Sequence, residues 1–198
     1  MKDISIFHSR IIPNYRMIII PGSVWRYNYA VATSTAFRYL NLLVALICAA
    51  FLGYAYWLQY TEFLDPCPLC IFQRVAFFAL GLVALAAALH NPGRRGRTIY
   101  ALLGGFCAAM GTAIAGRHVW LQNLPPDQVP ECGPGLEYML RAFPLSRTIR
   151  ETLTGSGECA SVDWTFAGLS MPWWTLFWFV MLGALVLTIG LRRRFACH

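Results

Sequence analysis

The sequence predicts an all-α membrane protein: a four-transmembrane-helix bundle with one long extramembrane loop that contains a short amphipathic helix. Three observations predict this fold. The 198 residues are 58% hydrophobic and 13% charged, with a mean hydropathy of +0.52, which is typical of integral membrane proteins rather than soluble globules. Four stretches are apolar and long enough to cross a bilayer. All but one of the basic residues are arginines, and they gather at the ends of these stretches.

The four expected spans cover residues 39–60, 69–89, 98–116 and 172–191. The third is rich in glycine and alanine, which suits close helix packing in lipid. The long loop covers residues 121–163, and within it apolar residues recur at helical spacing over 136–143. We expect this short amphipathic piece to lie on the membrane surface.

The spans form one membrane domain over residues 38–194. Residues 1–37 contain short apolar runs, but Pro13, Arg16 and Pro21 interrupt them before they reach spanning length. We expect this segment to be a basic, poorly ordered cytoplasmic extension, and residues 195–198 to be a cytoplasmic tail.

The basic residues set the orientation of the chain in the membrane. With four spans, the clusters before the first span, between the second and third, and after the fourth share one side: Arg10, Arg16, Arg26, Arg38, Arg94, Arg95, Arg97, Arg192, Arg193 and Arg194. That side should be cytoplasmic, with both termini, and the long loop should face outward. Because these charges mark span ends, the lipid bilayer is the expected partner and nucleic acid is not.

A Cys-x-x-Cys pair, Cys67 and Cys70, stands at the mouth of the second span. Pro66 and Pro68 keep a helix from running back through the pair, and Pro68 suits a first helical turn. The free N–H groups and the dipole of such a helix N-terminus favour a thiolate. Arg74 lies one turn deeper than Cys70 on the same face. A charge at that depth is costly, so we expect it to have a partner and a functional role.

The long loop carries a second pair, Cys132 and Cys159, on the same outer side of the membrane. Disulfides persist in such an oxidising compartment, and thiol–disulfide exchange needs accessible sulfurs within reach of each other. A flexible stretch at 155–159 is expected to let the loop pair reach an outside protein. Exchange from the loop pair to the helix-mouth pair would carry two electrons to the membrane. The remaining cysteines, Cys48, Cys107 and Cys197, are expected to be inert.

A zinc site would need a second close Cys or His pair, whereas Cys132 and Cys159 stand alone in the sequence. We therefore expect no metal.

The chain resembles the disulfide bond formation protein B (DsbB) family over roughly residues 38–194. The resemblance rests on Cys67-Pro-Leu-Cys70-Ile-Phe-Gln-Arg74, Arg117-His118, Cys132, Gly157-Glu-Cys159 and Trp164-Thr-Phe-Ala-Gly-Leu-Ser-Met-Pro172. It implies a four-span enzyme of the bacterial inner membrane whose redox cysteines face the periplasm. Such an enzyme is a quinone-dependent protein-dithiol oxidoreductase. It reoxidises a periplasmic DsbA-like thiol oxidase and passes two electrons to a membrane quinone, either ubiquinone or menaquinone.

The resemblance also implies a catalytic role for each of the four outer cysteines. Cys132 would be attacked by the reduced partner thiol, and Cys159 would then exchange with Cys67. Cys70 would be released as a thiolate beside the quinone ring and form a charge-transfer contact with it.

Two further residues would bind the cofactor together with Cys70. Arg74 would stabilise the thiolate and the developing quinol oxyanion, and His118 would lie near the quinone head group. Simpler readings stay open for both: Arg74 could extend along its stem to the interface, and His118 could be an interfacial histidine beside Arg117 and Trp120.

Two other functions stay open on the residues themselves. A vitamin K epoxide reductase-like enzyme also carries Cys-x-x-Cys at a helix mouth. The position of the loop pair between spans three and four favours the DsbB-like order. A non-enzymatic tetraspan protein with structural disulfides would be a different class. It predicts that neither Cys67 nor Cys70 reacts with thiol reagents or a quinone.

Overall fold

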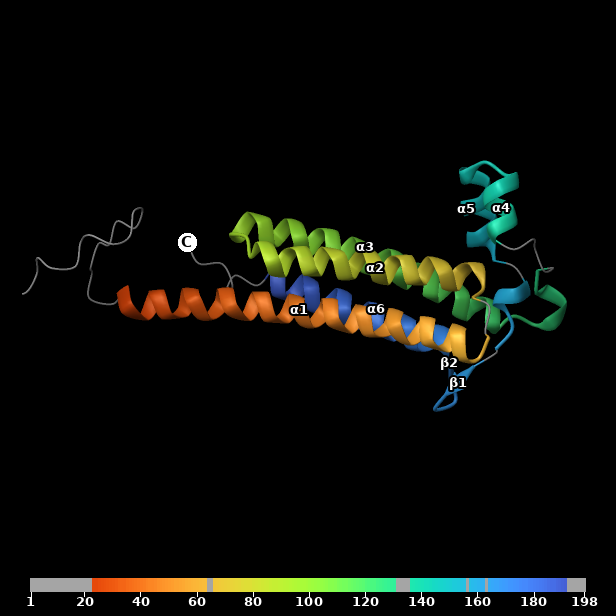
Figure 1. The fold of residues 1–198 in the computed structure, drawn as a ribbon, viewed down its shortest axis with the longest axis horizontal. Helices are drawn as coiled ribbons and strands as arrows, with labels where there is room; N and C mark the ends of the chain where they lie inside the picture. Colours follow the sequence, from red (N-terminus) through yellow and green to blue (C-terminus); the bar gives the residue numbers. More distant parts are fainter. Residues whose placement is uncertain (1–22, 64–65, 131–135, 156, 163, 192–198) are drawn as a thin grey trace, which may run out of the picture.

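The computed structural model is a bundle of four long helices with short helices and a β-hairpin gathered at one end (Figure 1). It describes residues 23–63, 66–130, 136–155, 157–162 and 164–191. Residues 1–22, Cys132 and the tail 192–198, with Cys197, lie outside the described residues, so the expectations for them stay predictions.

The four long helices are α1 (Ser23–Thr61), α2 (Pro68–His90), α3 (Arg94–Gln122) and α6 (Met171–Leu191). Each contains a stretch long and apolar enough to cross a membrane: Thr35–Thr61, Pro68–His90, Arg94–Gln122 and Met171–Leu191. The predicted fold class, an all-α membrane protein with four spans, is therefore confirmed. The turn between α2 and α3 and the end of α6 lie at one end of the bundle (Figure 1).

Two helices extend beyond the expected spans. The α1 helix begins at Ser23 rather than near residue 39, since no glycine or proline interrupts the chain between Gly22 and Gly53. The α3 helix continues to Gln122 rather than ending at 116. Arg117 lies within the helix, and its guanidinium lies 4.1 Å from the ring centre of Trp120. A charged residue that ends an apolar span therefore does not end this helix.

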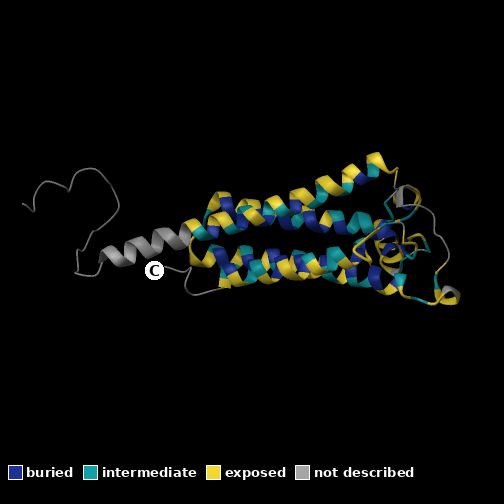
Figure 2. Ribbon diagram, turned by 90° about the horizontal axis from the view of Figure 1, so that it is seen from below, coloured by how far each residue is buried: buried dark blue, intermediate teal, exposed yellow. Residues whose placement is uncertain are grey.

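The helices are arranged so that α2 lies between α1 and α3, and α3 packs closely against α6. Glycine permits the closest approach: a Cβ on Gly104 would lie 2.8 Å from the Val186 side chain. The expected role of small residues in α3 is thus confirmed. Buried residues face the inside of the bundle and exposed ones face outward (Figure 2). The outer surface carries large apolar side chains such as Leu46 and Phe106, as a lipid-facing surface does.

The loop between α3 and α6 contains more structure than one amphipathic helix. It holds η1 (Pro126–Gln128), α4 (Leu136–Ala142), α5 (Leu145–Thr154) and η2 (Gly157–Cys159). The α4 helix matches the predicted amphipathic piece, whereas α5 was not predicted. Pro144 separates the two by standing at the N-cap of α5, and the Thr148 hydroxyl ties them together by donating to the Met139 carbonyl at 3.1 Å.

A small hairpin, β1 (Thr165–Phe166) and β2 (Leu169–Ser170), joins the loop to α6. Its two turn residues, Ala167 and Gly168, both have positive φ angles of 51° and 77°, as a type I′ turn requires. The Ser170 hydroxyl donates to Gln122 Oε1 at 2.6 Å, and the Trp174 indole N–H donates to the Phe166 carbonyl at 3.2 Å. These bonds fix the hairpin to the ends of α3 and α6.

Candidate active site

Cys67 and Cys70 lie at the N-terminus of α2, as the sequence predicts. Cys67 is the N-cap residue, with an extended backbone, and its sulfur accepts a hydrogen bond from the Cys70 backbone N–H at 3.3 Å. Pro68 occupies the first turn, where its missing N–H costs nothing. The cap places the Cys67 sulfur over the free N–H groups of the helix, which favour a negative charge there.

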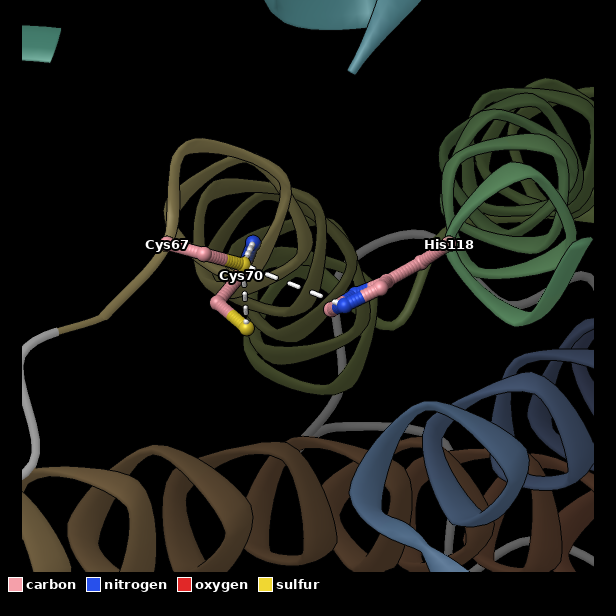
Figure 3. Close-up of side chains that lie close together, drawn as sticks. All are labelled: Cys67, Cys70 and His118. Carbon is pink, nitrogen blue, oxygen red and sulfur yellow. Dashed lines mark hydrogen bonds between the residues drawn. The ribbon is translucent and has the colours of Figure 1, made fainter. Parts of the chain in front are cut away.

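The two sulfurs are close enough to exchange a bond with a small movement. The Cys67 thiol donates to Cys70 Sγ at 3.0 Å, and both cysteines are free (Figure 3). A disulfide needs about 2.05 Å between its sulfurs, so closure requires a movement of about 1 Å. Because Cys70 accepts the hydrogen bond, it is the sulfur better placed to carry the negative charge of the reduced pair.

Cys159 lies against this pair rather than in an exposed loop. The turn η2 buries it completely in a cluster with Leu69, Ile114 and Leu121, against which Cys67 also packs. Its side chain forms a hydrogen bond with that of Cys67. The expectation that this loop cysteine reaches outward is therefore not met in this state of the protein. Three of the four predicted catalytic cysteines come together, and the fourth, Cys132, is outside the described residues.

His118 reaches the pair from α3 (Figure 3). Its Nε2 lies 3.9 Å from Cys67 Sγ, and its Nδ1 lies 3.1 Å from the side-chain nitrogen of Gln73. Gln73 in turn accepts a hydrogen bond from the Thr175 hydroxyl of α6 at 2.8 Å. His118 is 3% exposed and Gln73 is 4% exposed. The ring of His118 is thus buried in the bundle beside Cys67, and its role stays a prediction.

Sequence reasoning missed Gln73 and Thr175 as site residues. The available signal was a lone amide in an otherwise apolar helix, which has to find a partner inside the bundle.

Arg74, which lies inside the second span, has hydrogen-bond partners on a neighbouring helix. Its guanidinium donates to Gln59 Oε1 at 2.6 Å and to the Ala55 carbonyl at 3.2 Å, both on α1. It also lies 5.0 Å from the centre of the Tyr56 ring. Both described acceptors are neutral oxygens, so they anchor the side chain without cancelling its positive charge. Gln59 is a third site residue that the sequence did not reveal.

A cavity of about 460 Å³ opens beside these residues, between α1 and α6 and beneath the hairpin. Its other walls are mainly apolar and aromatic. Its polar lining is supplied by Gln59, Cys67, Cys70, Gln73, Arg74, His118, Gln122, Glu158, Ser161 and Thr175. Three of the aromatic rings pack in a row: Trp164 stacks on Phe166 with ring centres 6.1 Å apart, and Trp174 is tilted against Phe166 at 5.9 Å. The site thus joins reactive sulfurs to a space of small-molecule size.

The donor atoms of Cys67, Cys70 and His118 lie within 4.8 Å of one another. Structural zinc sites take four ligands in a tetrahedron, so this group of three does not by itself indicate a resident metal. The expectation that the site holds none stays a prediction.

The two membrane cysteines outside the site differ in burial. Cys48 is 1% exposed and packs in the bundle core, as predicted for a small apolar residue. Cys107 is half-buried on α3. Neither is among the described residues that line the cavity.

The pKa of Cys67, which lies just outside the spans, reflects its neighbours. The hydrogen bond with Cys159 lowers it, but the hydrogen bond with Cys70, burial and the charge of Cys70 outweigh this and raise the pKa of Cys67 to about 12. In the reduced pair the proton therefore stays on Cys67 at neutral pH.

Replacing the neighbouring sulfur should release this proton more easily. In Cys70→Ala the two influences of Cys70 that raise the pKa of Cys67 are gone, so the pKa falls and the thiolate fraction at pH 8 grows. We expect alkylation of Cys67 to become about tenfold faster or more, since each pKa unit is tenfold in thiolate. Peptide mapping after timed iodoacetamide treatment measures this, with Cys107→Ala as control. An unchanged or slower rate would contradict the assignment of the proton to Cys67.

Comparisons with known proteins agree with this arrangement. The family model described as disulfide bond formation protein DsbB matches residues 37–189. The protein named disulfide bond formation protein B from Hahella chejuensis is 57% identical over 143 residues, covering 72% of this chain and 87% of the relative. Its namesake from Methylococcus capsulatus shows the same identity and coverage. The one from Nitrosococcus oceani is 53% identical over 150 residues, covering 76% and 89%. This four-helix membrane chain therefore belongs to the DsbB family of disulfide bond formation proteins.

Proposed function

We propose that this chain oxidises the thiols of a soluble periplasmic DsbA-like thiol oxidase and passes the two electrons to a membrane quinone. The observation that carries the proposal is the meeting of three cysteines, Cys67, Cys70 and Cys159, beside a cavity inside a membrane-spanning bundle. Sulfur chemistry and a space open to a lipid-soluble molecule are thereby combined in one site.

The exchange steps leave atoms and electrons balanced. The partner thiolate attacks Cys132 of a Cys132–Cys159 disulfide, and Cys159 leaves as a thiolate. The second thiolate of the partner later attacks its sulfur in this mixed disulfide, so the partner disulfide forms and Cys132 leaves as a thiolate. The Cys159 thiolate then attacks the Cys67 sulfur of a Cys67–Cys70 disulfide, and the electron pair of the broken bond leaves on Cys70. The hydrogen bond between Cys159 and Cys67 supports this second step, because the attacking and attacked atoms are already neighbours.

The residues around the cavity fit a quinone ring. Its volume of about 460 Å³ falls in the range of about 300–1,000 Å³ that is common for small-molecule sites. Flat aromatic side chains line the wall, Arg74 supplies N–H groups for a ring oxygen, and His118 would lie near the quinone head group. A quinone bound there would accept two electrons and two protons.

Within such a site each side chain has a distinct task. Cys70 holds the electron pair at the cavity edge after exchange. Arg74, anchored by Gln59, keeps a positive charge beside that sulfur and beside the oxygen on which negative charge develops. The row of aromatic rings of Trp164, Phe166 and Trp174 keeps water from the reacting sulfur.

The orientation of the protein in the membrane follows from the basic end of the bundle. We assign that end to the cytoplasm, which puts the cysteines in the periplasm.

Quinone reduction by the purified protein in detergent tests the proposed function. The protein is mixed with a reduced DsbA-like thiol and a soluble ubiquinone analogue, and then with a menaquinone analogue. We expect turnover that is lost in Cys70→Ser and kept in Cys107→Ser, because Cys107 lies outside the cavity. Absence of turnover with both quinones, in folded protein, would overturn the proposal and favour a structural role.

Arg74→Ala separates quinone use from thiol exchange. Loss of the guanidinium removes charge stabilisation beside Cys70 but leaves Cys67 and Cys159 in place. We expect kcat/KM for the quinone to fall by about 10- to 100-fold, which corresponds to a charged hydrogen bond. The rate of exchange with the partner thiol should change less than about threefold.

The exposed Arg95 at the opposite end of the bundle provides the matched control. A normal quinone KM and kcat in Arg74→Ala, or the same loss in Arg95→Ala, would contradict the role given to Arg74.

A further inference from the structure

We infer that Gln73, held in place by Thr175, is a positioning residue that fixes His118 in the tautomer whose Nε2–H points at the Cys67 sulfur. The inference deepens the proposed function, because it assigns a task within the same exchange chemistry. It is carried by a continuous buried network that crosses three helices, from Thr175 on α6 through Gln73 on α2 to His118 on α3.

The Gln73 amide is oriented by its bond to Thr175. Its Oε1 accepts from the Thr175 hydroxyl at 2.8 Å, which turns the amide nitrogen toward His118. The Thr175 hydroxyl lies 2.9 Å from the Pro172 carbonyl as well, so its position is fixed by its own helix. Gln73 is 4% exposed, so solvent has little access to replace either bond.

The orientation of the Gln73 amide determines the tautomer of the His118 imidazole. An amide NH₂ group can only donate, so Nδ1 of His118, 3.1 Å away, has to accept. A neutral imidazole that accepts at Nδ1 carries its proton at Nε2. That proton lies on the nitrogen that is 3.9 Å from Cys67 Sγ. At that distance it can donate to the sulfur, and the backbone of Cys159 is a second hydrogen-bond partner of His118.

This tautomer of His118 affects Cys67 as a leaving group. When the thiolate of Cys132 attacks Cys159 in a Cys67–Cys159 disulfide, the Cys132–Cys159 bond forms and the electron pair of the broken bond leaves on Cys67. An N–H group facing that sulfur stabilises the leaving thiolate and speeds its departure. In the opposite tautomer a lone pair would face the sulfur, and the protonated thiol would be favoured instead.

Other charged or titratable groups surround the same sulfur in the described part of the chain. Cys70 and Arg74 face the site from α2, and Cys159 and Glu158 face it from η2. The test therefore removes the interacting cysteines from every protein compared, and leaves Arg74 and Glu158 unchanged. Differences between variants then report on the network through His118.

The experiment measures the apparent pKa of Cys67 in a background with Cys70→Ser, Cys132→Ser and Cys159→Ser. Alkylation rates of the Cys67 peptide are followed by mass spectrometry from pH 6 to 11. Adding Gln73→Leu should raise the pKa of Cys67 by about 0.5–1 unit and slow alkylation at pH 7 by about three- to tenfold. Thr175→Val should act in the same direction by about two- to threefold, and Thr175→Ser should restore the rate.

Thr188→Val is the matched control, because Thr188 lies on the same helix and its hydroxyl donates to the carbonyl three residues back, Leu185, without a bond to Gln73. It should leave the pKa of Cys67 unchanged. A pKa of Cys67 that is unchanged or lowered in Gln73→Leu would overturn the inference. If Gln73→Leu does not fold, the three threonine variants are compared instead, and an unchanged or lowered pKa of Cys67 in Thr175→Val would overturn the inference.

Nitrogen NMR of ¹⁵N-histidine-labelled protein reads the tautomer directly. We expect the His118 signals to show a protonated Nε2 and an unprotonated Nδ1 in the parent and a mixture in Gln73→Leu. A protonated Nδ1 in the parent would overturn the inference. Neither readout uses a quinone or a partner protein, so a failure of the proposed function and a failure of this inference are distinguishable.

Discussion

Polar side chains inside a transmembrane bundle have to find their partners within the protein, because lipid offers none. The site at the mouth of α2 follows from this constraint. Gln73 bridges His118 and Thr175, and Arg74 crosses to Gln59 and the Ala55 carbonyl. Together these bonds join α2 to α1, α3 and α6, so the contacts that satisfy these groups also hold the bundle together around the cysteines. Chemistry and packing at this end of the molecule therefore depend on the same interactions.

The loop between α3 and α6 completes the site from the other side. The 3₁₀ turn η2 inserts Cys159 beneath the start of α2, and the hairpin fixed by Gln122 covers the cavity with aromatic rings. The sulfurs of Cys159, Cys67 and Cys70 are thereby placed in the order in which electrons would pass from the loop to the membrane. An exposed loop alone could not maintain that order, because exchange requires sulfur atoms in contact.

Much of this architecture could be predicted from the sequence because the membrane imposes strong patterns. Uninterrupted apolar stretches predicted the four helices, and Pro68 after Cys67 predicted a thiol at a helix N-terminus. Charged residues, however, mark where a span meets water and not where a helix stops, so α3 runs past Arg117 and carries His118 into the site. The apolar pattern also does not reveal which helix faces which.

For that reason the partnership of Gln73 with Thr175, or of Arg74 with Gln59, could not be derived from spacing. The burial of Cys159 depends on tertiary contacts with Leu69 and Leu121, which a glycine-rich loop sequence does not show.

The central claim is that Cys159 is held against Cys67, ready to exchange with it. Trapping that bond tests the claim most directly. In a Cys70→Ser, Cys132→Ser variant, mild oxidation of the folded protein in detergent should join Cys67 to Cys159 in near-complete yield. The disulfide would be identified by mass spectrometry of the linked peptides under non-reducing conditions. Recovery of Cys159 as a free thiol, readily labelled by a bulky maleimide while Cys67 is unpaired, would contradict the account.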